Sequence, residues 1–226
     1  KPYGFLAVGA GPLDDPHARE YVAALLSGAA FASVRDETSR RLLIDCGADP
    51  AHIDLAADPA CLLEARHSPS VDAILEEHSL AAGGNWLAIA LRPWPFSTNR
   101  DGLLATLAQG LDRALVAADA RALFVPMQPS GGEGDADLPF ARAVRERMRE
   151  RERTSVLETE TSPGEVSALL GASRAVVAMR LHELLLAANA GVPGLPIAYD
   201  PKVRAIAAEL GIEELVLPVD PLSPEQ

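Results

Sequence analysis

The chain has 226 residues, 48% of them hydrophobic, which is enough to bury the cores of two α/β units. Its 32 acidic and 20 basic side chains give a formal net charge of −12, which argues against nucleic-acid binding through a basic surface. This charge remains compatible with a small anion in a local basic pocket. No run of about 18 apolar residues is present, so no transmembrane helix is expected.

Short apolar runs alternate with stretches of helical periodicity, which is the pattern of parallel β–α–β units. The apolar runs predict buried strands at residues 5–8, 31–34, 53–56, 86–91, 122–126, 155–157, 175–179, 197–199 and 215–217. The periodic stretches predict helices at residues 16–27, 37–46, 101–118, 138–151, 163–171, 181–190 and 202–210. The expected fold class is therefore α/β.

Capping residues support several of these helix boundaries. Ser162 and Glu165 in "SPGE" form the pattern of a capping box, with proline at the first helical position. Gly171 is expected to end the same helix. Asp36 and Asp200 are expected to cap the helices that follow them.

Turn-forming residues between positions 64 and 85 predict a boundary between two units. The segments "EARHSPS" and "AAGGN" flank a short helical piece there, and a new strand begins at Trp86. We therefore assign residues 1–78 to an N-terminal unit and residues 79–226 to a C-terminal unit. Because Lys1 leads directly into a strand, we expect the N-terminal unit to be incomplete.

Most signature motifs are weak or missing in this sequence. The segment "GAGP" at residues 9–12 lacks the G-x-G-x-x-G spacing, and no Walker loop, H-E-x-x-H or G-x-S-x-G occurs. The five histidines are scattered, so no metal site is expected. Cys46 and Cys61 suggest buried thiols, not a disulfide framework, and hence a cytoplasmic protein.

Three basic residues stand where predicted strands turn into helices. Arg180 and His182 lie at one helix start and Lys202 at another. A cation at a helix start costs roughly 0.3–1 kcal/mol, because the N–H groups there carry partial positive charge. A bound phosphate or carboxylate would account for the arrangement, since both junctions should open on one sheet edge. Alternatively, Arg180 pairs with a core carboxylate, His182 is structural and Lys202 points into water.

Two further arginines end predicted strands. Arg35 in "ASVRDETS" contacts a ligand or forms an ion pair with Asp36 or Glu37. Arg92 in "IALRPWPF" contacts a ligand or braces the Pro-rich loop that follows it. The Gly-rich connection at residues 129–137 also follows a strand, at the end where α/β sheets place ligands.

Several segments, in chain order, resemble the polysaccharide pyruvyl transferase family, in particular its bacterial CsaB-like branch. They are "AVGAGPL", "ASVRDETSRRLL", "LAADPACLL", "LRPW", "FVPMQ", "SPGEVSALLGASRAVVAMRLHELLLAANAGVP" and "AYDPKV". The long C-terminal block is the most specific of them. Ala178 replaces a glycine that the family often has before M-R-L-H, and "GLPIAYD" replaces a more usual V-V-G-I-S-Y-D. The family normally carries another Gly-rich strand–loop region before "GAGPL".

The resemblance implies two Rossmann-like units in a GT-B-like arrangement, with parallel sheets and helices on both faces. It implies a transferase that moves the pyruvyl group of phosphoenolpyruvate onto two hydroxyls of a cell-wall or surface-polysaccharide sugar, forming a ketal and releasing phosphate. Phosphoenolpyruvate is then a co-substrate, and no cofactor is needed. The acceptor would be a sugar or a lipid-linked saccharide, and a lipid-linked acceptor would bring the chain close to a membrane.

The resemblance also implies roles for the basic residues. Arg180, Lys202 and Arg35 would bind the phosphate and carboxylate of the donor, and the donor site would lie mainly in the C-terminal unit. Arg92 would be a further substrate contact. Positioning and electrostatic stabilisation would then supply most of the rate gain.

Proton transfer needs further groups. His182 would serve as an acid or as a phosphate ligand. Asp101 would be the general base, with Asp58 or an acid of the 133–137 loop as alternatives. A nucleotide-sugar glycosyltransferase of the same architecture, and a non-catalytic member that binds an anionic metabolite or a protein partner, remain alternative functions.

Overall fold

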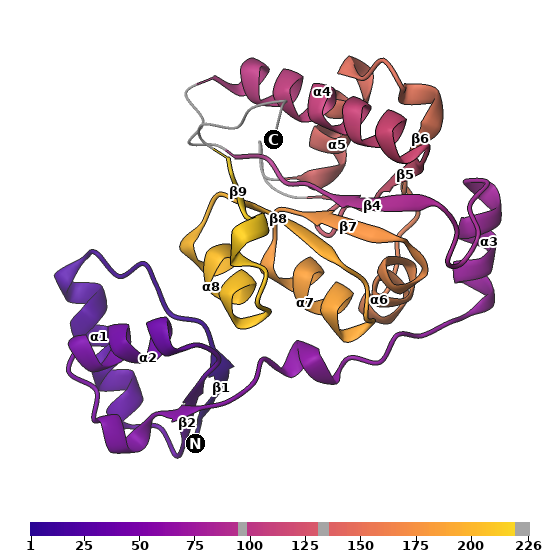
Figure 1. The fold of residues 1–226 in the computed structure, drawn as a ribbon. Coiled ribbons are helices and arrows are strands. Elements are labelled where there is room, and N and C mark those ends of the chain that lie inside the picture. Colours follow the sequence, from indigo (N-terminus) through magenta and orange to yellow (C-terminus); the bar gives the residue numbers. More distant parts are fainter. Residues whose placement is uncertain (95–98, 131–135, 220–226) are drawn as a thin grey trace. The chain divides into compact units, whose positions relative to one another are not determined.

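The structure, a computed structural model, describes residues 1–94, 99–130 and 136–219. The chain divides into two compact units, Lys1–Leu62 (unit 1) and Leu63–Gln226 (unit 2). Each unit contains a parallel sheet whose strands are joined by helices (Figure 1). The predicted α/β class is therefore confirmed.

Unit 1 is a small three-stranded α/β unit. Its strands β1 (Phe5–Val8), β2 (Ala32–Val34) and β3 (Asp54–Leu55) pair in parallel in that order. The strands are joined by α1 (Pro16–Ser27), by α2 (Glu37–Asp45) and by a short 3₁₀ turn at Pro50–His52. Its core consists of apolar side chains from both helices and the strands, including Leu26, Val34, Leu43 and Ile53. The strand ends place Gly9, Arg35 and Asp58 at one edge of the sheet.

Unit 2 contains a six-stranded parallel sheet in the order β6-β5-β4-β7-β8-β9. The strands are β4 (Trp86–Ala90), β5 (Arg121–Phe124), β6 (Thr154–Val156), β7 (Ala175–Ala178), β8 (Gly194–Ala198) and β9 (Leu217–Pro218). The chain starts in the middle of the sheet, proceeds to one edge, and then returns to build the other half. The strand order therefore reverses between β4 and β7, where doubly wound sheets place their ligands.

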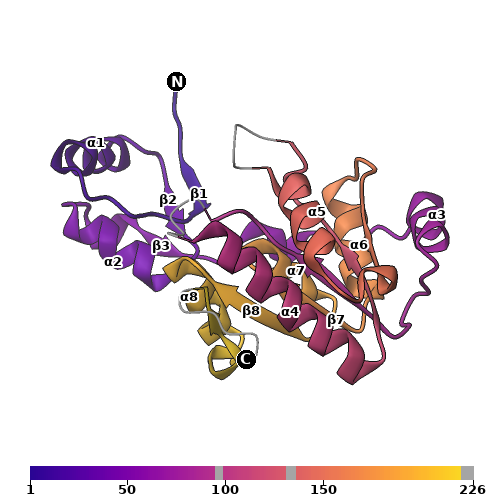
Figure 2. The same ribbon diagram turned by 90° about the horizontal axis from the view of Figure 1, so that it is seen from above.

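Helices cover both faces of the unit 2 sheet (Figures 1 and 2). One face carries α4 (Arg100–Ala118) and α5 (Asp137–Arg147), and the other carries α6 (Pro163–Ala172), α7 (Leu181–Asn189) and α8 (Pro201–Glu209). Because side chains alternate along a strand, both faces of the sheet bury apolar residues. Ile89, Phe124 and Val177 pack in the cluster that contains the α4 and α5 side chains, whereas their buried strand neighbours, such as Ala88 and Leu123, lie outside that cluster.

The boundary between the units lies at Leu62 and Leu63, and not at residue 78 as expected. The difference arises because α3 (Pro69–Glu77) packs against α6 of unit 2. The Arg66 N–H donates to the Gly164 carbonyl (3.0 Å), and the Ser70 hydroxyl donates to the Glu165 carboxylate. These contacts join residues about 100 positions apart, which the turn pattern of the sequence does not reveal.

The expected strands and helices are present, with shifted ends. The capping box of Ser162 and Glu165 is confirmed, as are the caps at Asp36 and Asp200. Gly171 does not end α6, which continues to Ala172. Instead it allows close packing, since a Cβ at this position would lie 3.1 Å from the Ala190 Cβ.

The helix predicted at residues 138–151 ends earlier, at Arg147. The Asp112 carboxylate of α4 accepts the backbone N–H groups of Arg149 and Glu150, both at 2.9 Å, and so draws the chain out of the helix. A 3₁₀ turn at Arg151–Arg153 then leads into β6. Within the described ranges, none of the helices combines the length and apolar character needed to cross a membrane.

Candidate functional site

The carboxyl ends of four adjacent strands in unit 2 bring a set of polar side chains together. Arg92 follows β4 and Arg180 follows β7, the two strands that flank the reversal of strand order. Gln128 and Tyr199 follow β5 and β8, the outer neighbours of this pair. Ligands of doubly wound sheets bind at this place, because the loops on either side diverge there and leave room.

Arg180 is anchored by a buried carboxylate. Its Nη2 donates to Asp137 Oδ1 at 2.7 Å and lies 3.4 Å from Gln128 Oε1. Asp137, at the start of α5, is 1% exposed, and its other oxygen accepts the Gln128 N–H at 2.8 Å. Burial opposes the charge of Arg180, but the hydrogen bond and the negative charge of Asp137 outweigh it and raise the pKa of Arg180. Arg180 therefore pairs with a core carboxylate, as one of the alternatives expected, and still keeps 20% of its side-chain surface exposed.

Arg92 lies against an aromatic pair. Its Nη1 donates to the Tyr199 hydroxyl at 2.8 Å, and its guanidinium carbon lies 4.9 Å from the centroid of the Tyr199 ring. The Trp94 ring lies 5.0 Å from the same ring, at an interplanar angle of 52°. Arg92 thus braces the loop after β4 against the loop after β8, and it does so beside the reversal of strand order.

Glu183 is a fully buried acid next to Arg180. It lies in the first turn of α7, is 1% exposed, and has its Oε1 4.0 Å from Arg180 Nε. Burial raises the pKa of Glu183 to about 8, although its own backbone N–H and the charge of Arg180 oppose the shift. Sequence reasoning missed this residue, because a glutamate near a helix start is typical of an exposed partner of the helix dipole.

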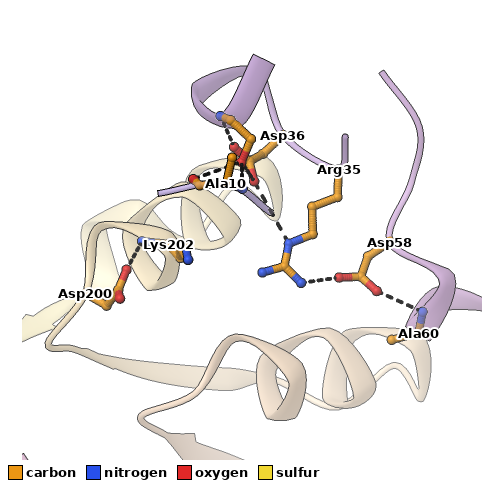
Figure 3. Close-up of polar contacts among 8 residues, drawn as sticks. Ala10, Arg35, Asp36, Asp58, Ala60, Asp200 and Lys202 are labelled. Carbon is orange, nitrogen blue, oxygen red and sulfur yellow. Dashed lines mark hydrogen bonds and ion pairs between the residues drawn. The ribbon is translucent and has the colours of Figure 1, made fainter. Parts of the chain in front are cut away.

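His182 and Lys202 occupy the first turns of two neighbouring helices. His182 is exposed at the start of α7, and Lys202 is half-buried at the start of α8. The Lys202 backbone N–H donates to the Asp200 cap at 2.8 Å (Figure 3). Both residues therefore follow strands of the same sheet edge as Arg180, and their role in ligand binding stays a prediction.

Asp101, the expected general base, pairs with Arg147, which is not a member of this cluster. It is in the first turn of α4, where its side chain is 87% exposed and pairs with Arg147 Nη2 at 2.9 Å. A general base needs to lie within hydrogen-bond reach of the proton that it removes, directly or through one water. This placement gives no support to Asp101 as the base. Of the acids proposed in the 133–137 loop, Asp137 is the partner of Arg180, and residues 133–135 lie outside the described residues.

Arg35 occupies the corresponding sheet edge of unit 1. Its Nη1 pairs with Asp58 Oδ2 at 2.7 Å, while Asp36 Oδ2 lies 4.0 Å from its Nε (Figure 3). Gly9, after β1, leaves room for the guanidinium, because a Cβ there would come 2.8 Å from Arg35 Nη2. Asp58, the alternative base, is therefore the ion-pair partner of Arg35, and its Oδ1 also accepts the Ala60 N–H at 2.9 Å.

Two serines that flank Arg35 hold the end of β1 in place. Ser33 Oγ accepts the Ala7 N–H at 2.8 Å, and Ser39 Oγ accepts the Ala10 N–H at 2.9 Å. Ser39 also donates to the Asp36 cap at 2.9 Å. These serines were not expected to have a role, although the sequence shows them at fixed positions around the arginine. In the part of the chain that the structure describes, no group of three His, Cys, Asp or Glu side chains could hold a metal ion.

A family profile described as polysaccharide pyruvyl transferase matches residues 1–201. The chain belongs to the polysaccharide pyruvyl transferase family. This confirms the resemblance noted in the sequence and supports a transferase. Two segments that resemble the family, "SVRDE" and "ADPA", supply the partners of the Arg35–Asp58 ion pair. A third, "MRLHE", supplies Arg180 and Glu183.

Several solved structures have a fold similar to that of this chain. UDP-GlcNAc 2-epimerase from Methanocaldococcus jannaschii is 13% identical with a TM-score of 0.67, over 96% of this chain and 59% of that one. The α,α-trehalose 6-phosphate synthase from Burkholderia multivorans is 15% identical with a TM-score of 0.58, over 99% and 55%. HepE from Anabaena, in complex with UDP and glucose, is 15% identical with a TM-score of 0.53, over 87% and 53%.

These neighbours belong to the GT-B class of glycosyltransferases and epimerases, so the expected fold class is confirmed for the Rossmann-like units with helices on both faces of a parallel sheet. At identities of 16% or lower, the likeness concerns the fold alone. The chain spans about half the length of the solved structures that it matches, between 50% and 59%.

Proposed function

We propose that this family member transfers the pyruvyl group of phosphoenolpyruvate to a sugar of a cell-wall or surface polysaccharide. Two sugar hydroxyls form two C–O bonds to C2 of the donor, and the bond between C2 and the phosphate oxygen breaks. One hydroxyl proton goes to the methylene carbon, which becomes a methyl group, and the other leaves with the phosphate. The product is a pyruvate ketal that keeps its carboxylate.

The observation that carries this proposal is the pair of arginines at the reversal of strand order. Arg92 and Arg180 follow adjacent strands, and Arg180 directly precedes the N-terminus of α7. The donor carries a phosphate and a carboxylate, and both groups are bound well by guanidinium groups and by helix N-termini. Asp137 balances the charge of Arg180, so the positive charge available to an anion comes from Arg92 and from the N-terminus of α7, while the partly exposed Arg180 supplies hydrogen-bond donors.

The other predicted residues complete the proposed site. Lys202 contributes further positive charge to the phosphate and carboxylate of the donor. Arg35, which lies in unit 1, is a further candidate for binding these groups. His182, exposed in the first turn of α7, can give the proton to the methylene carbon or bind the phosphate. The acceptor is a sugar or a lipid-linked saccharide, and the reaction takes place in the cytoplasm, in keeping with a sequence that suggests no disulfide framework.

Ligand-dependent thermal stability tests the donor assignment. Phosphoenolpyruvate at 100 times its Kd should stabilise the 226-residue chain by about 2.7 kcal/mol. Arg180→Ala should abolish this gain while the apo protein stays folded. No stabilisation of the unsubstituted chain at any donor concentration would contradict the proposal. Phosphate release with a panel of hexosamine-containing lipid-linked acceptors then tests the transfer itself.

A nucleotide-sugar glycosyltransferase is the second candidate, because the HepE structure of similar fold holds UDP and glucose. Stabilisation by UDP or a UDP-sugar, but not by phosphoenolpyruvate, would favour it. Tight donor binding without phosphate release on any acceptor would instead favour a non-catalytic member that binds an anionic metabolite.

A further inference from the structure

The carboxyl group of Glu183 is buried, and one of its oxygens lacks a hydrogen-bond partner among the described residues. Its side chain is 1% exposed, and its Oε2 has no hydrogen-bond partner among residues 1–94, 99–130 and 136–219. The buried Nε of Arg180 likewise has none within these ranges, and it faces Glu183 Oε1 across 4.0 Å. Two complementary groups thus lie close together without the hydrogen bond of an ionised pair.

The charge around Arg180 depends on the state of this acid. Asp137 already balances Arg180 through a 2.7 Å hydrogen bond. A second ionised carboxylate on the same guanidinium would make this group of three net negative, and would repel an anion at the start of α7. A protonated Glu183 leaves the group neutral and the positive N-terminus of α7 available.

The groups that face Glu183 come from three places in unit 2. Arg180 precedes it on α7, Asp137 lies at the start of α5, and Arg92 follows β4. Tyr199, after β8, interacts with Arg180 in turn. The helices α6 and α8, which flank α7, bury only uncharged side chains. Burial favours the protonated form of Glu183, its own backbone N–H and the two arginines oppose this, and the charge of Asp137 adds to the effect of burial.

We propose that Glu183 is a positioning residue of the anion site, which keeps its proton while the anion is bound and thereby preserves the positive potential of Arg180 and α7. This inference rests on the proposed function and deepens it. It follows that a bound anion strengthens the hold on this proton, and that an anion binding above neutral pH takes up a proton from solution. Affinity should accordingly fall as Glu183 ionises.

Calorimetric titration of the 226-residue chain with phosphoenolpyruvate, and separately with inorganic phosphate, tests the proposal at pH 6.5, 7.5 and 9.0. Glu183→Gln keeps the shape of the side chain and is neutral at every pH tested. At pH 6.5 the variant should bind the anion as tightly as the unsubstituted chain. At pH 9.0 the variant should bind it roughly tenfold more tightly than the unsubstituted chain. The titration of the ligand itself affects both proteins equally. Glu152→Gln is the matched control, because Glu152 is 90% exposed, and it should follow the unsubstituted chain.

Parallel pH curves for the unsubstituted chain and Glu183→Gln would overturn the proposal. Should the variant fail to fold, titration in two buffers of different ionisation enthalpy decides. The unsubstituted chain should take up about half a proton on binding near pH 8, because Glu183 is about half ionised there before the anion binds. The absence of proton uptake would overturn the proposal. If inorganic phosphate binds with this pH dependence and phosphoenolpyruvate does not bind, the donor assignment fails and the role of Glu183 stands. Absence of binding of both anions at pH 6.5 would overturn both.

Discussion

Arg180 and Asp137 form a 2.7 Å ion pair between the end of β7 and the start of α5. The two residues lie 43 positions apart, and Asp137 is fully buried. The pair fixes the direction of a guanidinium at the place where the strand order of the sheet reverses. A side chain held in this way is ordered before a ligand arrives, so binding costs less conformational entropy.

Asp137→Ala should lower the free energy of unfolding by roughly 2–4 kcal/mol, because it leaves Arg180 and the Gln128 N–H without their buried acceptor. Urea denaturation measures this loss. Asp101→Ala removes an ion pair of similar length (2.9 Å) from an exposed site and should cost about 0–1 kcal/mol. If both variants lose the same free energy of unfolding, the buried Arg180–Asp137 pair stabilises the fold no more than the exposed pair does.

Glu183 should make the protein less stable as the pH rises from about 4.5 to about 8. Its pKa is raised by folding, from 4.5 to about 8, so in this window the unfolded chain releases a proton that the folded chain keeps. Each pH unit of the window costs the folded state at most about 1.4 kcal/mol. Glu183→Gln should remove this slope from Tm measured against pH, and should match the unsubstituted chain near pH 4.5. An unchanged slope would show that the acid ionises freely in the folded protein.

Gly9→Ala should displace the Arg35 guanidinium, since the added Cβ would lie 2.8 Å from Nη2. We expect a loss of about 1 kcal/mol, because Arg35 would have to leave Asp58 or β1 would have to shift. Gly110→Ala is the matched control. Among the described residues, and apart from its chain neighbours and the backbone of its own helix, no atom lies within 4 Å of a Cβ at this position in α4, so the same change should stabilise the chain by roughly 0.5–1 kcal/mol. Chemical denaturation distinguishes the opposite signs.

Glu165 should stabilise the contact between α3 and α6 only while it is ionised. Hydrogen bonds from Ser70 and then from Ser162 lower the pKa of Glu165 to about 2. Because folding lowers this pKa, the contribution is present above about pH 4.5 and is lost as the pH falls toward 2. At pH 5, Glu165→Gln should therefore have a lower Tm than the unsubstituted chain. The difference between the two Tm values should become smaller as the pH is lowered to 2.5. If the difference in Tm does not change with pH, the packing of the Glu165 side chain, and not its charge, stabilises the contact.

The order of strands and helices could be predicted because each element is encoded locally. Buried strands appear as short apolar runs, and the capping box of Ser162 and Glu165 spans three positions along the chain. The two arginines at the reversal of strand order were also predictable, since parallel strands present their carboxyl ends at one edge. The sequence alone thus determined the fold class, the positions of the site residues along the chain and the family resemblance.

Only the tertiary structure decided which partners these residues have. Arg180 meets Asp137 from another helix, Arg35 meets Asp58 from another strand end, and Asp101 turns to Arg147 at the surface. From its position near a helix start, Glu183 is expected to be exposed and to interact with the helix dipole. It is buried because α7 packs against the sheet and the neighbouring helices. Burial and long-range pairing depend on how elements pack together, and a pattern that extends over a few residues carries no record of that packing.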